Sequence, residues 1–296
     1  MTAPLPLTPV REAAPAKLNL YLHVVGRRAD GYHLLDSLAA FTELGDEIVA
    51  APASSLALSV SGPFAAALSA EPDNLVLKAA RALAGACNVP ASASLLLEKH
   101  LPVASGIGGG SSDAAATLRA LCRLWAVAPG ADRVAAIAGA LGADVPVCLS
   151  ARAAFMGGVG EQLAPAPPLP AAGVVLVNPG VALPTVQVFK AREGGFGEIA
   201  RFEAAPRDAH GLARLLADRR NDLDAAAQRI VPQIGEVLAA LAASPGCLLA
   251  RMSGSGATCF GLYVDRSAAE RAAAWIAARA GTARWWVAPT RLKGMS

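Results

Sequence analysis

The residues of this sequence most suited to chemistry form a glycine-rich loop, "GIGGGSSDAA", at Gly106–Ala115. Glycines can take positive φ angles and bring backbone N–H groups close to an anion. A helix with an apolar face is predicted to start near Ser112, capped by Ser111, Ser112 and Asp113, and its first N–H groups and dipole would add to the attraction. The loop therefore predicts a phosphate site made from backbone. The alternative is a tight strand-to-helix turn without a ligand.

Two common nucleotide motifs and a flexible linker do not fit this loop. A dinucleotide fingerprint needs a third glycine where Ser111 stands, and an acidic residue about 20 positions further on at the end of a second strand. A Walker loop needs a lysine, and this loop contains none. A flexible linker would continue into polar low-complexity sequence, whereas an apolar-faced helix follows here. The glycines therefore indicate a defined geometry, and cations for a phosphate must come from elsewhere.

Three further places carry side chains that could act on a substrate. Lys17 stands among apolar neighbours in a strand-like run, where a lone charge is costly unless it meets a carboxylate or a phosphate; a solvated strand position is the alternative. Asp144 could accept a proton, or it could only cap the next helix. Tyr32 and His33 follow an Asp-Gly turn that could display their rings, although such a pair is more often a half-buried surface patch. The residues alone leave these alternatives open.

Strand-like and helical segments alternate along the chain and predict a mixed α and β fold. The predicted strands are 17–25, 55–62, 93–100, 174–180 and 284–290, with a strand–turn–strand unit over 247–264. The predicted helices are 74–86, the segment after the glycine loop, 131–142, 212–217, 230–243 and 268–280. The proline-rich segment 161–173 is expected to hold no regular structure and to be a domain junction or a crossing loop. The predicted domains are 1–160 and 161–296. The last strand, about 284–290, could instead pack back on the first domain.

The composition argues against several classes of protein. A chain of 296 residues can bury the core of one large domain or two ordinary ones. The net charge of +3 is too small and its residues too scattered for a nucleic-acid or membrane surface. No apolar run reaches the roughly 18–20 residues of a spanning helix, and prolines interrupt the start of the chain where an export signal would need an apolar core. We therefore expect a cytoplasmic protein with small-molecule partners.

The cysteines and histidines do not form a recognisable framework. The five cysteines are odd in number, widely spaced and without a CxxC pair, and the four histidines lack the spacing of metal ligands. Buried, reduced thiols are therefore expected, and no structural metal is expected.

The glycine loop, in the form PxxxGIGGGSSDAA, is similar to the phosphate-binding loop of the GHMP kinase superfamily. Segments on both sides of it look like the members that act on a cytidine-diphosphate-linked methylerythritol. These segments are "PAKLNLYLHVVGRRADGYHLLDSL" (15–38), "NLVLKAARAL" (74–83), "LGADVPVCL" (141–149), "ALPTVQVFK" (182–190), "RNDLD" (220–224) and "RMSGSGATCFGLY" (251–263). The resemblance implies a two-lobe α+β GHMP kinase fold, with an N-terminal ATP-binding lobe, a C-terminal substrate lobe and the active site in the cleft.

The resemblance also implies roles for individual residues. Asp144 would accept the proton of the substrate hydroxyl, and Lys17 would be the partner of Asp144 and of that hydroxyl. The implied ATP-binding residues are Asn74 and Lys99 on the adenine and ribose side, and Pro102, Val103, Ala104, Ser105, Gly106, Ile107, Gly108, Gly109, Gly110, Ser111 and Ser112. The implied substrate-binding residues are Asn19, Tyr32, His33, Asp144, Thr185 and Phe189, with the two aromatic rings and His33 at the cytidine end.

The implied activity is transfer of a phosphoryl group from ATP, which carries Mg²⁺, to the 2-hydroxyl of the cytidyl substrate, in the non-mevalonate synthesis of isoprenoid precursors. The implied partners are these two small molecules, without nucleic acid or membrane, and the implied state is a monomer or weak homodimer. Two alternatives remain at this point. One is another GHMP kinase, acting on homoserine, mevalonate or a sugar, and the other is a non-catalytic nucleotide-binding sensor.

Overall fold

The computed structural model describes residues 8–68, 74–279 and 281–294, which form two compact units. Unit 1 consists of the described residues of Met1–Ala16, Gly45–Val103 and Gly108–Ala151. Unit 2 consists of the described residues of Lys17–Leu44, Ala104–Ile107 and Arg152–Ser296. The chain changes unit inside strands β1 (Val10–Arg27) and β2 (His33–Ala51), and inside the glycine loop. The expected domain boundary near residue 160 stays a prediction.

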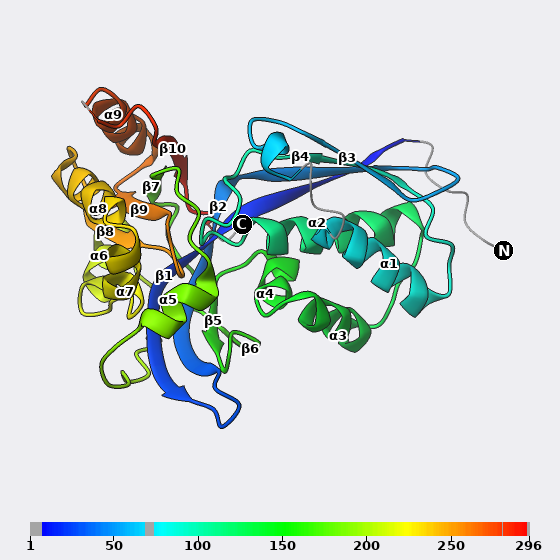
Figure 1. Ribbon diagram of the computed structural model, residues 1–296, viewed down its shortest axis with the longest axis horizontal. Helices are drawn as coiled ribbons and strands as arrows, with labels where there is room; N and C mark the ends of the chain where they lie inside the picture. Colours follow the sequence, from blue (N-terminus) through cyan, green and yellow to red (C-terminus); the bar gives the residue numbers. More distant parts are fainter. Residues whose placement is uncertain (1–7, 69–73, 280, 295–296) are drawn as a thin grey trace. The chain divides into compact units, whose positions relative to one another are not determined.

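In unit 1, helices pack together beside paired strands. Strand β3 (Ala57–Ser61) runs parallel to β4 (Ser94–Glu98), and β4 is antiparallel to the Glu47–Ala51 part of β2. The helices are α1 (Leu75–Cys87), α2 (Gly109–Leu124), α3 (Ala131–Leu141) and α4 (Val145–Ser150), with the short 3₁₀ turn η1 (Ala65–Ala67). Helices α1 and α2 lie side by side (Figure 1) and are in contact. The crossover from β3 through α1 to β4 is the connection that parallel strands need.

In unit 2, the main sheet is antiparallel, in the order β10 (Trp286–Arg291), β7 (Gly173–Asn178), β9 (Cys259–Tyr263), β8 (Leu249–Met252). The helices are α5 (Thr185–Ala191), α6 (Ala209–Ala217), α7 (Asp224–Ile230), α8 (Gln233–Ala243) and α9 (Arg266–Ala277). Val175 and Val177 of β7 share a buried core with Ile234, Val237 and Leu241 of α8. The all-apolar run of β7 is buried throughout, as expected for a strand covered on both faces.

A second set of strands in unit 2 continues from β2. Ser37–Ala39 of β2 pair with β5 (Ala154–Gly157), and β5 pairs with β6 (Gln162–Pro165). The expectation that 161–173 holds no regular structure is therefore wrong for residues 162–165, and also for Gly173, which begins β7. Strand β6 is the edge strand of this order, and its last residue is Pro165. Proline is tolerated at a sheet edge, but it has no N–H group to donate to a neighbouring strand, so the pairing ends there.

Most of the other predicted elements are confirmed, with shifted ends. The predicted last strand is β10, and it pairs with β7 inside unit 2. Helix α9 ends at Ala277, and residue 280 of the predicted helix lies outside the described residues. Helix α2 begins at Gly109, so the start predicted near Ser112 is wrong by three residues. Strand β2, which is 19 residues long, was not predicted, because neither strict alternation nor a continuous apolar run marks it.

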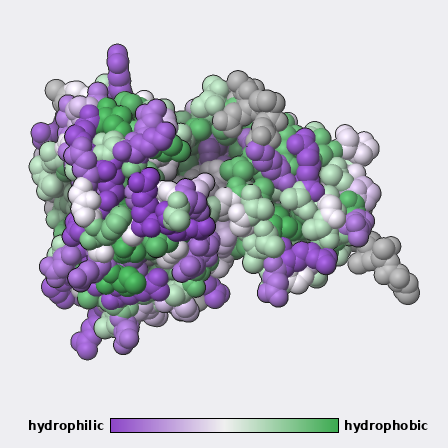
Figure 2. Space-filling model, turned by 60° about the horizontal axis from the view of Figure 1, so that its bottom comes forward, coloured by the Kyte–Doolittle hydropathy of each residue, from purple (hydrophilic) through white to green (hydrophobic). Residues whose placement is uncertain are grey.

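Neither the drawn surface nor the cysteines indicate a further functional site. Figure 2 shows hydrophilic and hydrophobic residues interspersed on the drawn face. No helix in the described part of the chain combines the length and the apolar composition that crossing a membrane requires. All five cysteines are free thiols, and Cys148 and Cys259 are buried as expected, whereas the other three are half-buried.

Candidate functional site

The start of helix α2 offers backbone N–H groups to an anion. Gly108 occupies the N-cap in the left-handed conformation (φ 64°, ψ 19°), and a glycine has no side chain with which to cap the helix. The amide of Ser112 donates to the Gly108 carbonyl at 2.8 Å, so the amides that come before it have no partner within the helix. Capping by Ser111, Ser112 and Asp113 is therefore a wrong prediction, because the glycine N-cap lets the helix begin earlier. Gly110 is exposed and Ser111 half-buried, which leaves this end accessible.

The two serines of this turn differ in what their hydroxyls do. Ser112 is buried, and its Oγ donates to the Pro15 carbonyl at 2.6 Å. That proton is already used inside unit 1. Ser111 is half-buried and is the better placed of the two for the expected phosphate contact.

The earlier part of the glycine loop, Ala104–Ile107, belongs to unit 2 and is held there by backbone contacts. The carbonyl of Ser105 accepts from the Thr258 amide at 3.0 Å, and that of Ile107 accepts from the Lys17 amide at 2.9 Å. Gly106 (φ +76°) lies so close to the turn between β8 and β9 that a Cβ atom there would be 2.5 Å from the Gly256 carbonyl oxygen. This glycine therefore permits close packing of two turns.

Lys17 and Asn19 meet on one face of β1, as their spacing predicts. Lys17 Nζ donates to Asn19 Oδ1 at 2.8 Å, and both residues are buried. Asn19 is itself held by two hydrogen bonds. Its side-chain Nδ2 donates to Ser37 Oγ at 2.7 Å, and its backbone N–H donates to Ser253 Oγ at 3.1 Å. The ammonium group of Lys17 is thus oriented by a fixed amide, which is an arrangement suited to stabilising negative charge on a substrate.

Asp144 is half-buried at the N-cap position of α4, in unit 1. Its side chain makes no cap hydrogen bond to that helix. The capping alternative therefore does not describe what the carboxylate does. Because Lys17 belongs to unit 2 and Asp144 to unit 1, their expected partnership stays a prediction.

Two of the residues expected at the cytidine end of the substrate, His33 and Phe189, form a pair of stacked rings in unit 2. His33 and Phe189 have ring centroids 5.2 Å apart and planes 24° from parallel. Burial lowers the pKa of His33, and the charges of Arg27 and Arg192 lower it further. The ring is therefore neutral at pH 7, with one nitrogen to donate and one to accept. Tyr32 is exposed, and Thr185 Oγ1 lies 2.8 Å from Ser255 Oγ.

Asn74 and Lys99, the residues expected near adenine and ribose, have clear roles within unit 1. Asn74 caps α1, and its Oδ1 accepts from the Val76 amide at 2.9 Å. Lys99 Nζ donates to Asp46 Oδ2 at 2.5 Å and to Asp113 Oδ2 at 2.8 Å, with all three residues buried. Asp46 was not identified from the sequence, because it stands 53 positions from Lys99 and no spacing pattern links the two. Asp113 was expected only to cap the helix after the loop.

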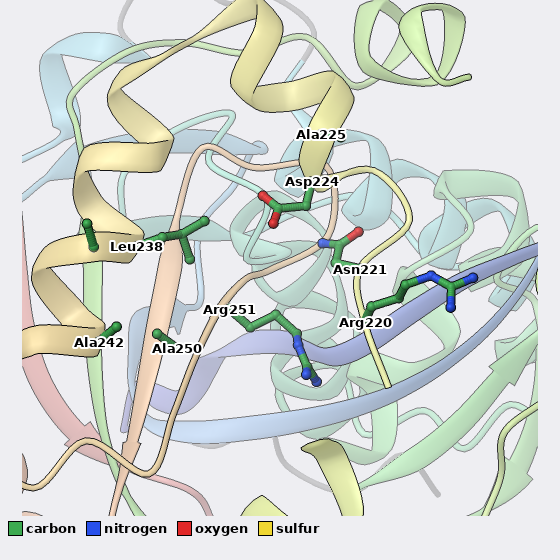
Figure 3. A pocket seen from close by; sticks show the side chains of 9 residues that line it. Arg220, Asn221, Asp224, Ala225, Leu238, Ala242, Ala250 and Arg251 are labelled. Carbon is green, nitrogen blue, oxygen red and sulfur yellow. The ribbon is translucent and has the colours of Figure 1, made fainter. Parts of the chain in front are cut away.

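A pocket of about 560 Å³ in unit 2 holds polar side chains, but they are already used (Figure 3). Arg251 donates to the carbonyls of Leu20 (2.8 Å), Leu216 (2.9 Å) and Arg219 (2.5 Å). Asn221 donates to two further backbone carbonyls. The pocket is lined by Arg220, Asn221, Asp224, Ala225, Leu238, Ala239, Ala242, Ala250 and Arg251. These donors join segments of the chain, so we assign the pocket no ligand.

The described residues contain no group of three or more histidine, cysteine or acidic side chains that could hold a metal ion. A dedicated protein cage for Mg²⁺ therefore does not fit the described side chains. Mg²⁺ commonly binds through substrate phosphates and water together with one or two protein groups.

Comparisons with known proteins decide the family. The N-terminal domain of GHMP kinases matches residues 74–152, and their C-terminal domain matches residues 199–280. The chain is 56% identical to 4-diphosphocytidyl-2-C-methyl-D-erythritol kinase of Paramagnetospirillum magneticum, over 94% of this chain and 97% of that protein. It is 54% identical to the kinase of the same name from Rhodospirillum rubrum, over 99% and 96%. The chain belongs to the 4-diphosphocytidyl-2-C-methyl-D-erythritol kinase family of GHMP kinases.

Solved structures agree with this family. A crystal structure of 4-(cytidine 5'-diphospho)-2C-methyl-D-erythritol kinase is 37% identical, with a TM-score of 0.76, and the match covers 96% of this chain and all of that one. The crystal structure of homoserine kinase from Cytophaga hutchinsonii has a TM-score of 0.73 at 14% identity, and the match covers 97% of this chain and 95% of that one. At this identity the likeness is evidence of a shared fold alone. The resemblance predicted from the sequence is confirmed: the chain is a small-molecule kinase with the two-domain α+β fold of GHMP kinases.

Proposed function

We propose that this GHMP kinase transfers the γ-phosphoryl group of ATP to the 2-hydroxyl of 4-diphosphocytidyl-2-C-methyl-D-erythritol, in the non-mevalonate synthesis of isoprenoid precursors. The observation that carries the proposal is identity above 50% with kinases of that name over almost the whole chain. The local geometry supports it independently. The open start of α2 suits a phosphate, and the stacked His33 and Phe189 suit a base.

The transfer step needs stabilised phosphates and an acceptor for one proton. In the proposed mechanism the N–H groups at the start of α2 bind phosphate oxygens of ATP, together with the rest of the loop from Pro102 to Ser112. Asp144 takes the proton of the substrate hydroxyl as the hydroxyl oxygen attacks phosphorus and becomes more acidic. Lys17, oriented by Asn19, stabilises the negative charge at the reacting groups. Mg²⁺ arriving with ATP would neutralise charge on its phosphates.

Recognition of the cytidyl substrate is assigned to unit 2. Phe189 and Tyr32 offer aromatic faces for the pyrimidine, and the neutral His33 can hydrogen-bond to its edge. Thr185 completes this side of the pocket. For ATP, Asn74 and Lys99 are proposed on the adenine and ribose side.

The remaining proposals concern the setting of the enzyme. We propose a cytoplasmic location, a monomer or weak homodimer, and no nucleic-acid or membrane partner. The small net charge of +3 supports the last of these. A domain boundary near residue 160 is proposed on the proline-rich sequence that follows it.

The decisive experiment measures ADP release by the purified enzyme with three acceptors: the cytidyl methylerythritol, mevalonate and homoserine. Turnover with the first acceptor alone is expected. Turnover with another acceptor instead would assign a different GHMP kinase activity, and ATP binding without turnover on any of them would indicate a sensor. In the same assay Asp144→Asn is expected to lower kcat by roughly 10²–10⁴. The control Asp132→Asn changes an exposed carboxylate at the start of α3 and is expected to keep wild-type kinetics.

A further inference from the structure

A buried ion cluster, formed by Lys99, Asp46 and Asp113, lies directly under the start of α2. A Cβ atom on Gly109, the first residue of α2, would stand 3.1 Å from Lys99 Nζ and 3.7 Å from Asp46 Oδ2. Asp113 is the fifth residue of the helix, about one turn from its start. The three side chains are at most 3% exposed. Their charges therefore act on the first turn of α2 with little screening by water.

The same cluster fixes the backbone that enters the loop. Asp46 Oδ1 accepts from the amides of His100 at 2.6 Å and Leu101 at 2.8 Å. The Lys99 backbone is held as well, since its amide donates to the Ser61 carbonyl at 2.7 Å. Lys99 and Asp46 thus tie the ends of β3 and β4 to β2, while the bond from Lys99 to Asp113 ties them to α2.

The cluster contains one cation and two carboxyl groups. With both carboxyls ionised, a net negative charge would sit one turn below the amides that are to receive phosphate. Asp113 Oδ1 is buried and has no hydrogen-bond partner among the described residues, so only one oxygen of this group, Oδ2, is stabilised, by Lys99. Burial, together with the charge of Asp46, outweighs the attraction of Lys99 and raises the pKa of Asp113 to about 8.

We propose that Asp113 is a positioning residue that carries a proton at neutral pH, so that the ion cluster is electrically neutral where the nucleotide phosphates meet α2. The proposal rests on the proposed function, because it takes a nucleotide as the ligand of this helix. Loss of the proton places a negative charge within one turn of the phosphates and weakens nucleotide binding. Nucleotide affinity therefore decreases as the pH rises through the pKa of Asp113.

The charged groups that act on Asp113 are Lys99 and Asp46. The elements in contact with α2 carry other charged residues, which do not figure among the causes of its pKa. These are Lys78 and Arg81 on α1, Asp132 and Arg133 on α3, and Asp144 at the start of α4, while Glu12 of β1 is paired with Arg119 and Arg123. The pH effect is accordingly assigned to Asp113 alone.

The test is calorimetric titration with ADP and Mg²⁺ from pH 7 to 9, on the wild type, Asp113→Asn and the control Asp132→Asn. The wild type and the control are expected to lose affinity about threefold to tenfold over this range, as a charge near a helix terminus does. The asparagine variant keeps an oxygen for Lys99 and cannot ionise, so its affinity is expected to stay constant. The KM for the cytidyl substrate should show no matching dependence on Asp113.

The outcomes separate this inference from the proposed function. Equal pH dependence in the wild type and Asp113→Asn overturns the inference, even if the enzyme phosphorylates the cytidyl substrate. Absence of turnover with that substrate overturns the proposed function, while the ADP titrations still test the cluster. If Asp113→Asn does not fold, Asp113→Ser replaces it, and a flat profile in the wild type is by itself sufficient to reject the role of Asp113.

Discussion

The turn at the start of α2 (Gly108–Ser112) and the turn between β8 and β9 (Ser253–Thr258) are both rich in glycine and serine, yet their surroundings differ. The α2 turn is exposed or half-buried at three consecutive residues, Gly109, Gly110 and Ser111, and lies over the ion cluster. The β8–β9 turn is buried at every residue and is held by neutral groups. Glycine therefore leaves backbone amides accessible in the first turn and allows backbone to touch backbone in the second.

The difference follows from what comes after each turn. A helix after the α2 turn leaves its first amides without partners inside the helix. A strand after the β8–β9 turn pairs back on the strand before it, so that the Ser253 amide donates to the Thr258 carbonyl at 2.9 Å. Composition alone does not separate a turn with open amides from a packed turn, whereas the element that follows does.

The largest expected effect is on the packed contact, through Gly106→Ala. Gly106 has φ +76°, and an added Cβ would lie 2.5 Å from the Gly256 carbonyl oxygen and 2.7 Å from that of Ser253. Backbone atoms cannot move aside as side chains do. We expect a loss of about 3 kcal/mol or more in the free energy of unfolding, measured by urea denaturation.

The matched variant is Gly110→Ala in the first turn of α2. Among the residues that the structure describes, an added Cβ there would meet only Leu75 Cδ1, at an ordinary 3.6 Å, in a backbone conformation that alanine favours. Its free energy of unfolding should be equal to or above that of the wild type, by at most about 1 kcal/mol. Equal losses in the two variants would remove the distinction between the two turns.

A second effect distinguishes the two turns by the pH dependence of stability. The ion cluster under the α2 turn contains groups that titrate, whereas the groups that hold the β8–β9 turn do not. The pKa of Asp113 is raised from its ordinary value to about 8 in the folded protein, so the folded state binds one more proton than the unfolded state between these values. The stability that Asp113 contributes is fully present below the pKa that this group has in the unfolded chain. It is lost as the pH rises through the pKa that the group has in the folded protein. This group therefore lowers the wild-type free energy of unfolding by at most about 1.4 kcal/mol per pH unit.

Asp113→Asn removes this dependence. Its stability relative to the wild type is expected to rise between pH 5 and pH 8 and to level off above, in urea denaturation at each pH. Asp132→Asn serves as the control, because that carboxylate is exposed. A difference between Asp113→Asn and the wild type that does not change with pH would show that Asp113 is ionised throughout, and would leave the two turns alike in this respect.

The sequence predicted the α2 turn better than the ion cluster that lies beneath it. The glycines and the helix after them predict open amides, because both are local properties. The helix start was misplaced, since the left-handed conformation of Gly108 competes with the serine and aspartate caps that propensity favours. The pairing of Asp46 and Asp113 with Lys99 depends on how β2, β4 and α2 meet in space, and no local pattern records it.

The predicted site residues likewise divide into contacts that follow from local spacing and contacts that depend on tertiary structure. Lys17 and Asn19 are two apart on a strand, so their contact could be predicted from the period of a strand. His33 and Phe189 are far apart in the chain, and only the resemblance to a family of kinases placed them together before the structure did. The buried turn with Ser253 was part of a matching segment, yet its hydrogen bonds to the glycine loop follow from tertiary packing.

A smaller effect than that of Gly106→Ala is expected for Ser253→Ala, which removes a hydroxyl that holds the β8–β9 turn. Ser253 Oγ donates to the Gly106 carbonyl at 3.0 Å and accepts from the Asn19 amide at 3.1 Å. Removing the hydroxyl leaves two backbone groups without this partner, one of them on a fully buried strand position, at a cost of about 1–3 kcal/mol in the free energy of unfolding. The exposed Ser267→Ala provides the control.

This loss should be independent of pH, because the Ser253 contact contains only a hydroxyl, an amide and a carbonyl. It should also overlap with that of Gly106→Ala, since both variants disturb one contact, so that the double variant loses less stability than the two single variants together. Full additivity would mean that the hydroxyl and the glycine act separately. The β8–β9 turn would then hold the glycine loop through two independent contributions, the close packing at Gly106 and the hydrogen bonds of Ser253.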